Sequence, residues 1–234
     1  FNSLIGISTN LKEGLINAKS PDIIISCGRK LAKIAIFLRK YHKNSSLVQI
    51  MNPGAGVERF DLIAVPAHDP PLSGNNVITL TGAPHGLTSA VLETARMRWL
   101  EKLQSLPSPR IAVIIGGSTR RREFSAAMAS ELGQRVSEMA NKAGGSVMIT
   151  TSRRPGAVAD VLLDEINCPA RIYRWGDDGD NPYVGFLACA DAVVVTGDSV
   201  SMCSEACAVS APVQIFAPSS LVTDKHARCH QTLY

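Results

Sequence analysis

Apolar runs and amphipathic stretches alternate along the second half of the chain. Runs such as RIAVIIGG at 110–117 are rich in β-branched residues, and stretches such as 123–145 repeat apolar residues at helical spacing. The pattern predicts five strands, at 110–117, 146–152, 171–175, 191–197 and 212–216, with four helices between them, at 123–145, 157–166, 181–190 and 199–209. Apolar strands joined by helices are typical of a parallel sheet that is covered on both faces.

The first half carries the same pattern in a less complete form. It predicts strands at 21–28, 46–51, 61–66 and 76–80, and helices at 29–42 and 87–106. The segment PSP at 107–109 then interrupts the pattern, as a linker does. We therefore expect an α/β protein of two Rossmann-like domains, 1–106 and 107–234, which face each other across a cleft and whose parallel sheets carry helices on both faces. The first domain is expected to lack a strand or two at its N-terminal side.

Polar, glycine-containing segments follow four predicted strands of the second domain. They are GGSTRRR at 116–122, TTSRRP at 150–155, WGDDGDNP at 175–182 and TGDSVS at 196–201. In open parallel sheets, ligands bind outside the carboxyl ends of the strands. Glycine lets backbone N–H groups approach a ligand, and arginine supplies paired donors to phosphate. A single Gly pair is usually a turn and a single Arg run is usually solvated, but the four segments together predict a site for a nucleotide diphosphate.

The last of these segments leads directly into a helix. Asp198 is most simply the N-cap of that helix. Ser199 and Ser201 are placed to donate hydrogen bonds to a diphosphate, together with the free N–H groups of the first turn. Glu205 lies one turn after Ser201 on the same helix face, where a carboxylate can accept both hydroxyls of a ribose. The alternative is a capped helix with Glu205 on a solvated face.

Composition narrows the class of protein. Hydrophobic residues make up 45% of the chain and charged residues 19%, which is typical of a packed globular protein. No apolar run reaches the roughly 18 residues of a membrane span, and the first 20 residues lack the pattern of a signal peptide. The six cysteines show no CxxC spacing. They indicate reduced thiols, and hence a cytoplasmic location.

The net charge of +4 is distributed unevenly. Residues 1–105 carry 12 Lys and Arg against 7 Asp and Glu, whereas 106–234 carry 12 against 13. A basic first half suits an anionic lipid surface, and thus peripheral membrane contact, or an anionic substrate equally well. No nucleic-acid partner is expected, because aromatic residues are only 5% of the chain and no long basic stripe is present.

Several segments spread over the chain carry a resemblance to a known family. They are SPDIIISCGRK, FDLIAVPAHD, TLTGAPH, AVIIGGSTR, ITTSRRP, NPYVGFLACADAVVVTGDSVSMCSEA and KHARCHQ. They resemble the mitochondrial fission (elongated mitochondria) family, which is widespread in bacteria. The segment TGDSVSMCSEACAVSAPV also resembles the sugar-nucleotide motif of GT-B glycosyltransferases.

The resemblance implies a fold and two alternative functions. The fold is GT-B-like, with a nucleotide-diphosphate sugar held mainly by the second domain in the interdomain cleft, and the implied activity is metal-independent glycosyl transfer without a cofactor. The plant members of the family imply instead a non-enzymatic adapter, which acts at a membrane through protein partners by recruiting dynamin-related proteins. An NAD-type oxidoreductase is not expected, because no G-x-G-x-x-G follows any predicted strand.

Carried over position by position, the resemblance places Ser199, Val200, Ser201 and Glu205 on the diphosphate and ribose, and Gly116, Gly117 and Ser118 on the loop after the first strand of the second domain. The full set of expected nucleotide-binding residues is Gly116, Gly117, Ser118, Thr151, Ser152, Arg153, Trp175, Asp198, Ser199, Val200, Ser201 and Glu205.

Catalytic candidates follow from the need for a general base in glycosyl transfer. His85 follows the predicted strand at 76–80, and His68 and Asp69 follow the strand at 61–66. A histidine beside proline and glycine is alternatively a turn residue that bonds to the backbone. His226 and His230 have the i, i+4 spacing of a zinc-binding helix, but no glutamate follows His226 and no third ligand is evident. We therefore expect a packing surface there, and no metal.

Overall fold

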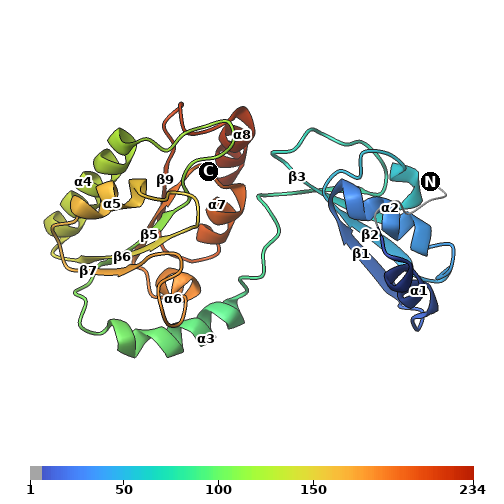
Figure 1. Cartoon of the computed structure of the whole chain (residues 1–234), viewed down its shortest axis with the longest axis horizontal. Coiled ribbons are helices and arrows are strands. Elements are labelled where there is room, and N and C mark those ends of the chain that lie inside the picture. Colours follow the sequence, from blue (N-terminus) through green and yellow to red (C-terminus); the bar gives the residue numbers. More distant parts are fainter. Residues whose placement is uncertain (1–6) are drawn as a thin grey trace. The chain divides into compact units, whose positions relative to one another are not determined.

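The computed structural model describes residues 7–234 (Figure 1). Internal packing divides the chain into two units, Phe1–Thr81 and Gly82–Tyr234. Each unit is built on its own parallel sheet, with the strand order β1-β2-β3-β4 in the first and β7-β6-β5-β8-β9 in the second. These parallel sheets flanked by helices confirm the α/β class that the sequence predicts.

The first unit contains four strands and two α-helices among its described residues. They are α1 (Thr9–Asn17), β1 (Ile23–Cys27), α2 (Gly28–Leu38), β2 (Ser46–Ile50), the 3₁₀ turn η1 (Val57–Arg59), β3 (Leu62–Pro66) and β4 (Val77–Leu80). Helix α2 packs on one face of the sheet, where Ala35 and Ile36 meet Leu47 and Ile63 in a common core. On the opposite face, the edge-strand residues Ile25 of β1 and Ile78 of β4 are exposed, at 65% and 46%, whereas Ala64 of β3 is buried.

The second unit alternates strands and helices throughout. Its elements are α3 (Ser89–Leu100), the 3₁₀ turn η2 (Glu101–Leu103), β5 (Arg110–Ile115), α4 (Ala126–Ala143), β6 (Ser146–Thr151), α5 (Val158–Asp164), β7 (Ala170–Tyr173), α6 (Tyr183–Ala188), β8 (Ala192–Thr196), α7 (Val200–Ala206), β9 (Val213–Phe216) and α8 (Asp224–Leu233). Among these described elements, no helix has the length and the apolar character needed to cross a membrane.

The central strand β5 shows why the second sheet is covered on both faces. Alternate strand residues point to opposite faces, so Val113 joins the core under α4 and α5, whereas Ile114 joins the core under α3, α6 and α7. Figure 1 shows α4 and α5 on one side of this sheet and α3 and α6 on the other. The polar ends of β5, β6 and β8 are therefore held by two packed layers of helices.

Helix α3 packs with the second unit, although sequence reasoning placed it in the first domain because of the Pro-rich segment at 107–109. Trp99 of α3 is buried and meets the ring of Phe186 of α6 edge to face, with 6.0 Å between ring centroids. Gly185 makes this approach feasible, since a Cβ there would lie 2.3 Å from Trp99 Cγ. The division by packing therefore falls after Thr81.

Candidate functional site

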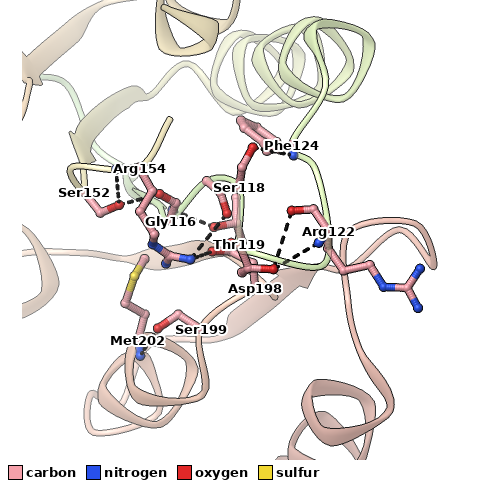
Figure 2. A network of polar contacts seen from close by, with 12 residues as sticks. Gly116, Ser118, Thr119, Arg122, Phe124, Ser152, Arg154, Asp198, Ser199 and Met202 are labelled. Carbon is pink, nitrogen blue, oxygen red and sulfur yellow. Dashed lines mark hydrogen bonds and ion pairs between the residues drawn. The ribbon is translucent and has the colours of Figure 1, made fainter. Parts of the chain in front are cut away.

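Three loops meet at the carboxyl edge of the second sheet (Figure 2). The strands β6, β5 and β8 are parallel neighbours, so the segments that follow them emerge at the same edge. The Ser152 hydroxyl donates to the carbonyl of Gly116, and the Gly116 N–H donates to Thr196 Oγ1 at 2.7 Å. The structure thus brings together the strand-end segments that the sequence placed at one edge.

An ion pair between a buried carboxylate and a partly exposed arginine lies within this network. The Asp198 side chain is fully buried, and its Oδ2 lies 2.8 Å from Nη1 of Arg154, whose side chain is 34% exposed. The same Nη1 donates to the carbonyl of Gly117 at 3.4 Å. Arg154 therefore ties the loop after β6 both to the loop after β5 and to the end of β8. Sequence reasoning quoted Arg154 within a motif but did not select it as a site residue.

The helix cap differs from the sequence prediction. Ser199, not Asp198, is the N-cap of α7, because the extended backbone at Ser199 places its hydroxyl to accept from the Met202 N–H at 3.4 Å. Asp198 instead turns its carboxylate toward Arg154. Val200 begins the helix and Ser201 is exposed at its first turn.

The two glycines after β5 allow the loops to touch one another. A Cβ on Gly116 would lie 2.2 Å from Asp198 Oδ2, and a Cβ on Gly117 would lie 2.5 Å from the backbone nitrogen of Pro155. Gly117 also has a φ of +111°, which disfavours other residues. We expected these glycines to admit a ligand, whereas the space beside them is filled by Asp198 and Pro155.

Most hydroxyls of the predicted site bond to the loop backbones and are not directed toward solvent. Ser118 Oγ accepts from the Phe124 N–H at 3.0 Å, and Thr151 Oγ1 accepts from the Trp175 N–H at 3.0 Å. Thr119 closes a turn by accepting from the Arg122 N–H at 3.2 Å. These bonds use the polar side chains to fix the loop backbones, which orients the longer side chains of the same loops.

The rim of this edge is positively charged. Arg120, Arg121, Arg122 and Arg153 are all exposed. Over residues 7–234, no acidic side chain forms an ion pair with any of these four arginines. The guanidinium of Arg153 lies 5.5 Å from the ring centroid of Trp175, a residue that is 54% exposed. The edge thus presents cationic side chains together with one exposed aromatic face.

Glu205 is held by a residue that sequence reasoning missed. It is half-buried on α7, and its Oε2 accepts a hydrogen bond from the hydroxyl of Tyr183, the first residue of α6. Burial, and next the bond to the Glu205 carboxylate, raise the pKa of Tyr183 well above its ordinary value. The available signal was Pro182, which marks a helix start and so puts Tyr183 at its first turn.

The catalytic candidates fall in different units. His85 is exposed in the second unit, and its Nδ1 accepts from the Leu87 N–H at 3.3 Å. The same segment is anchored on α7, because the Ala83 N–H donates to Ser204 Oγ at 2.8 Å. His68 and Asp69 are both buried in the first unit, at the turn that follows β3.

The histidine pair of α8 has structural roles. His226 Nδ1 accepts from the Thr223 N–H at 3.2 Å and completes a capping box, while His230 is buried with its Nε2 3.7 Å from the thiol of Cys203. Burial lowers the pKa of both histidines and raises that of Cys203. Throughout the described chain, no cluster of three or more His, Cys, Asp or Glu residues is arranged to hold a metal ion.

Two solved structures superpose on nearly the whole chain and show which class of fold it has. A Listeria monocytogenes protein described as a UDP-N-acetylglucosamine 2-epimerase superposes with a TM-score of 0.59 at 16% identity, over 97% of this chain and 66% of its own. The UDP-GlcNAc 2-epimerase of Methanocaldococcus jannaschii superposes with a TM-score of 0.56 at 11% identity, over 96% of this chain and 72% of its own. The chain therefore has the GT-B-like fold of these two epimerases.

Sequence comparison then gives the family. Residues 4–234 match the family model of mitochondrial fission ELM1, and the chain belongs to that family. It is 32% identical over 232 residues to the mitochondrial fission protein ELM1 of Arabidopsis thaliana and 30% identical over 256 residues to an uncharacterized protein of Rickettsia prowazekii. These matches cover 88% and 95% of this chain. They span 54% of the Arabidopsis protein, about half its length, and 72% of the Rickettsia protein.

Proposed function

We propose that the chain binds a nucleoside diphosphate, in the form of a nucleotide sugar, at the carboxyl edge of the second sheet. The observation that carries the proposal is the network of Figure 2, in which Asp198 and Arg154 join three strand-end loops. The same loops carry the exposed Arg120, Arg121, Arg122 and Arg153. Fixed loops suit recognition because little conformational entropy remains to be lost on binding.

Each part of such a ligand has a matching group. Arg120–Arg122 and the backbone N–H groups at Ser199–Ser201 suit the diphosphate, because charge-assisted donors bind phosphate oxygens most strongly. Glu205 suits the ribose hydroxyls, which are donors. Trp175, beside Arg153, offers an exposed face on which a base can stack. The remaining predicted residues, among them Ser118, Thr151 and Ser152, support this arrangement through the loop backbones.

The structural counterparts support the ligand class, since both are described as 2-epimerases of UDP-N-acetylglucosamine, a nucleotide sugar. Glycosyl transfer is the reaction we propose for the complete protein. His85 is the exposed member of the three catalytic candidates. Because its Nδ1 accepts a backbone N–H, the neutral ring carries its proton on Nε2 and acts there as a donor. His85 therefore suits stabilisation of a leaving phosphate better than the role of general base.

Alanine in place of Trp175 is expected to weaken UDP and GDP binding by about five- to a hundredfold, because stacking of a base on an aromatic ring contributes roughly 1–3 kcal/mol. Phenylalanine at the same position keeps an aromatic face and should restore most of the affinity. Inorganic pyrophosphate, which has no base, should bind both variants as it binds the wild type. Calorimetric titration measures all three ligands, and unchanged UDP affinity in Trp175→Ala would exclude this position for the base.

A second candidate function is that of an adapter at a membrane surface, which the distribution of charge favours and which is compatible with a relative that is a mitochondrial fission protein. The first unit carries nine Lys and Arg against five Asp and Glu, so the whole net charge of +4 resides there, whereas the second unit has 15 of each. No acidic residue occurs between Asp22 and Glu58. Helix α2 and the turn after it present exposed lysines in that interval, among them Lys30, Lys33 and Lys43.

Vesicle binding tests the adapter proposal. We expect co-sedimentation with vesicles of phosphatidylcholine and phosphatidylserine, and little with phosphatidylcholine alone. A lysine near an anionic surface contributes about 1 kcal/mol, so replacing Lys30, Lys33 and Lys43 by alanine should weaken binding by roughly a hundredfold. The matched control replaces three exposed cations of the second unit, Arg135, Lys142 and Arg171, and should retain binding. Equal sedimentation with both kinds of vesicle would contradict the proposal.

A further inference from the structure

The half-buried Glu205 accepts a hydrogen bond from a tyrosine of the neighbouring helix. Tyr183, at the start of α6, donates its hydroxyl to Glu205 Oε2 on α7. The two helices flank β8 in the chain and share one core on the same face of the sheet, to which Leu187 of α6 and Cys203 of α7 both contribute. The Tyr183 ring packs against that core. The phenol therefore comes from a fixed ring and not from a mobile surface side chain.

The bond engages only one side of the carboxylate. Within the described chain, Glu205 Oε1 accepts no hydrogen bond from a protein donor, and the side chain keeps part of its surface exposed. A carboxylate has about four lone-pair sites, so one phenolic donor leaves about three, enough for both hydroxyls of a ribose. Because the Tyr183 bond fixes the rotation of the carboxyl group, the remaining lone pairs point in defined directions.

We propose that Tyr183 is a positioning residue, which fixes Glu205 so that the site takes ribonucleoside diphosphates in preference to their 2′-deoxy counterparts. The inference rests on the proposed nucleotide-binding function. The two adjacent hydroxyls of a ribose are donors with a fixed spacing, and an oriented carboxylate accepts both. A 2′-deoxyribose supplies one hydrogen-bond donor fewer and should therefore bind more weakly. A carboxylate that rotates freely would bind both hydroxyls less well, so the difference in affinity between the two sugars would be smaller.

A structural role alone would not produce this preference. If Tyr183 only anchored the start of α6, its removal would lower stability and would weaken ribonucleotide and deoxyribonucleotide binding alike. A positioning role changes the ratio of the two affinities. Tyr173 provides a control for the Tyr183 bond. Its hydroxyl donates to the backbone carbonyl of Asp177 at 3.1 Å and not to Glu205.

The test compares the affinities of UDP and 2′-deoxy-UDP by calorimetric titration. We expect the wild type to prefer UDP by about tenfold or more, as the loss of a hydrogen bond to a charged group implies. Tyr183→Phe should reduce this preference to about two- or threefold, whereas Tyr173→Phe should leave it unchanged. Glu205→Asp, which retracts the carboxylate from Tyr183 and keeps its charge, should reduce it as well and serves if Tyr183→Phe folds poorly.

The outcomes separate the inference from the function on which it rests. Binding of neither nucleotide by the wild type would contradict the proposed function itself. Equal binding of both by the wild type would overturn the assignment of Glu205 to the ribose, and with it the role of Tyr183. A wild-type preference that Tyr183→Phe and Glu205→Asp both retain would overturn the positioning role and leave nucleotide binding intact.

Discussion

Replacing Gly116 by alanine should destabilise the second unit by roughly 3–5 kcal/mol, the range seen when a buried ion pair is broken. The added Cβ would lie 2.2 Å from Asp198 Oδ2 and 2.5 Å from its Oδ1. The carboxylate cannot remain there, so its bond with Arg154 is lost and a buried charge loses its partner. Gly116 has no positive φ, so the expected effect is entirely steric.

Urea unfolding measures this change through tryptophan fluorescence. Both tryptophans of the chain, Trp99 and Trp175, lie in the second unit, so the signal reports on that unit. Gly86→Ala is the matched control, because nothing lies within 4 Å of a Cβ at Gly86, and its effect should stay below about 1 kcal/mol. Equal unfolding midpoints for the two variants would show that the Asp198 carboxylate does not depend on Gly116.

Glu205→Ala is expected to weaken binding of UDP and GDP by about ten- to a hundredfold. Hydrogen bonds to a charged group contribute roughly 1.5–3 kcal/mol, and alanine removes the acceptor of the ribose hydroxyls. The variant also leaves the hydroxyl of the partly buried Tyr183 without its acceptor. Its thermal unfolding must therefore be recorded beside the titration.

Glu131→Ala provides the control for this titration. Glu131 is a glutamate of α4 whose partner is Arg135 one helical turn away, so its removal should leave nucleotide affinity unchanged. If the folded Glu205→Ala variant binds both nucleotides as tightly as the wild type, Glu205 belongs to a solvated helix face and the ribose lies elsewhere.

The strands could be predicted from the sequence because strands that are buried on both faces consist mainly of apolar residues. A run such as Ala192–Thr196 leaves no alternative to a central strand, and its neighbours alternate with helices of clear periodicity. Helix α1 was not predicted, since none of its residues Thr9–Asn17 is buried and its apolar positions are only Leu11, Leu15 and Ile16. The packing of α3 was also missed, because it depends on the fit of Trp99 over Gly185 and not on any local pattern.

The candidate site was predicted in its location and less well in its chemistry. In a parallel sheet the carboxyl ends of all strands lie at one edge. Residues that directly follow the strands, such as Ser118 and Ser199, could therefore be assigned to that edge from the sequence. Which polar groups bond to one another depends on the strand order, and β5 lies between β6 and β8 only in the folded sheet. The pairs Asp198–Arg154 and Glu205–Tyr183 join separate loops and helices, so no local spacing could reveal them.

Nuclear magnetic resonance of the isotope-labelled chain during titration with UDP and GDP tests most directly whether a nucleoside diphosphate binds at this edge. We expect saturable shifts in the backbone amides of 116–122, 152–154 and 199–201, with smaller shifts around Trp175 and Glu205. Amides in the last turns of α4 and α5, which end at Ala143 and Asp164 at the opposite edge of the sheet, should stay unchanged. The absence of shifts at millimolar nucleotide, or shifts that spare all three loops, would contradict nucleotide binding at this edge.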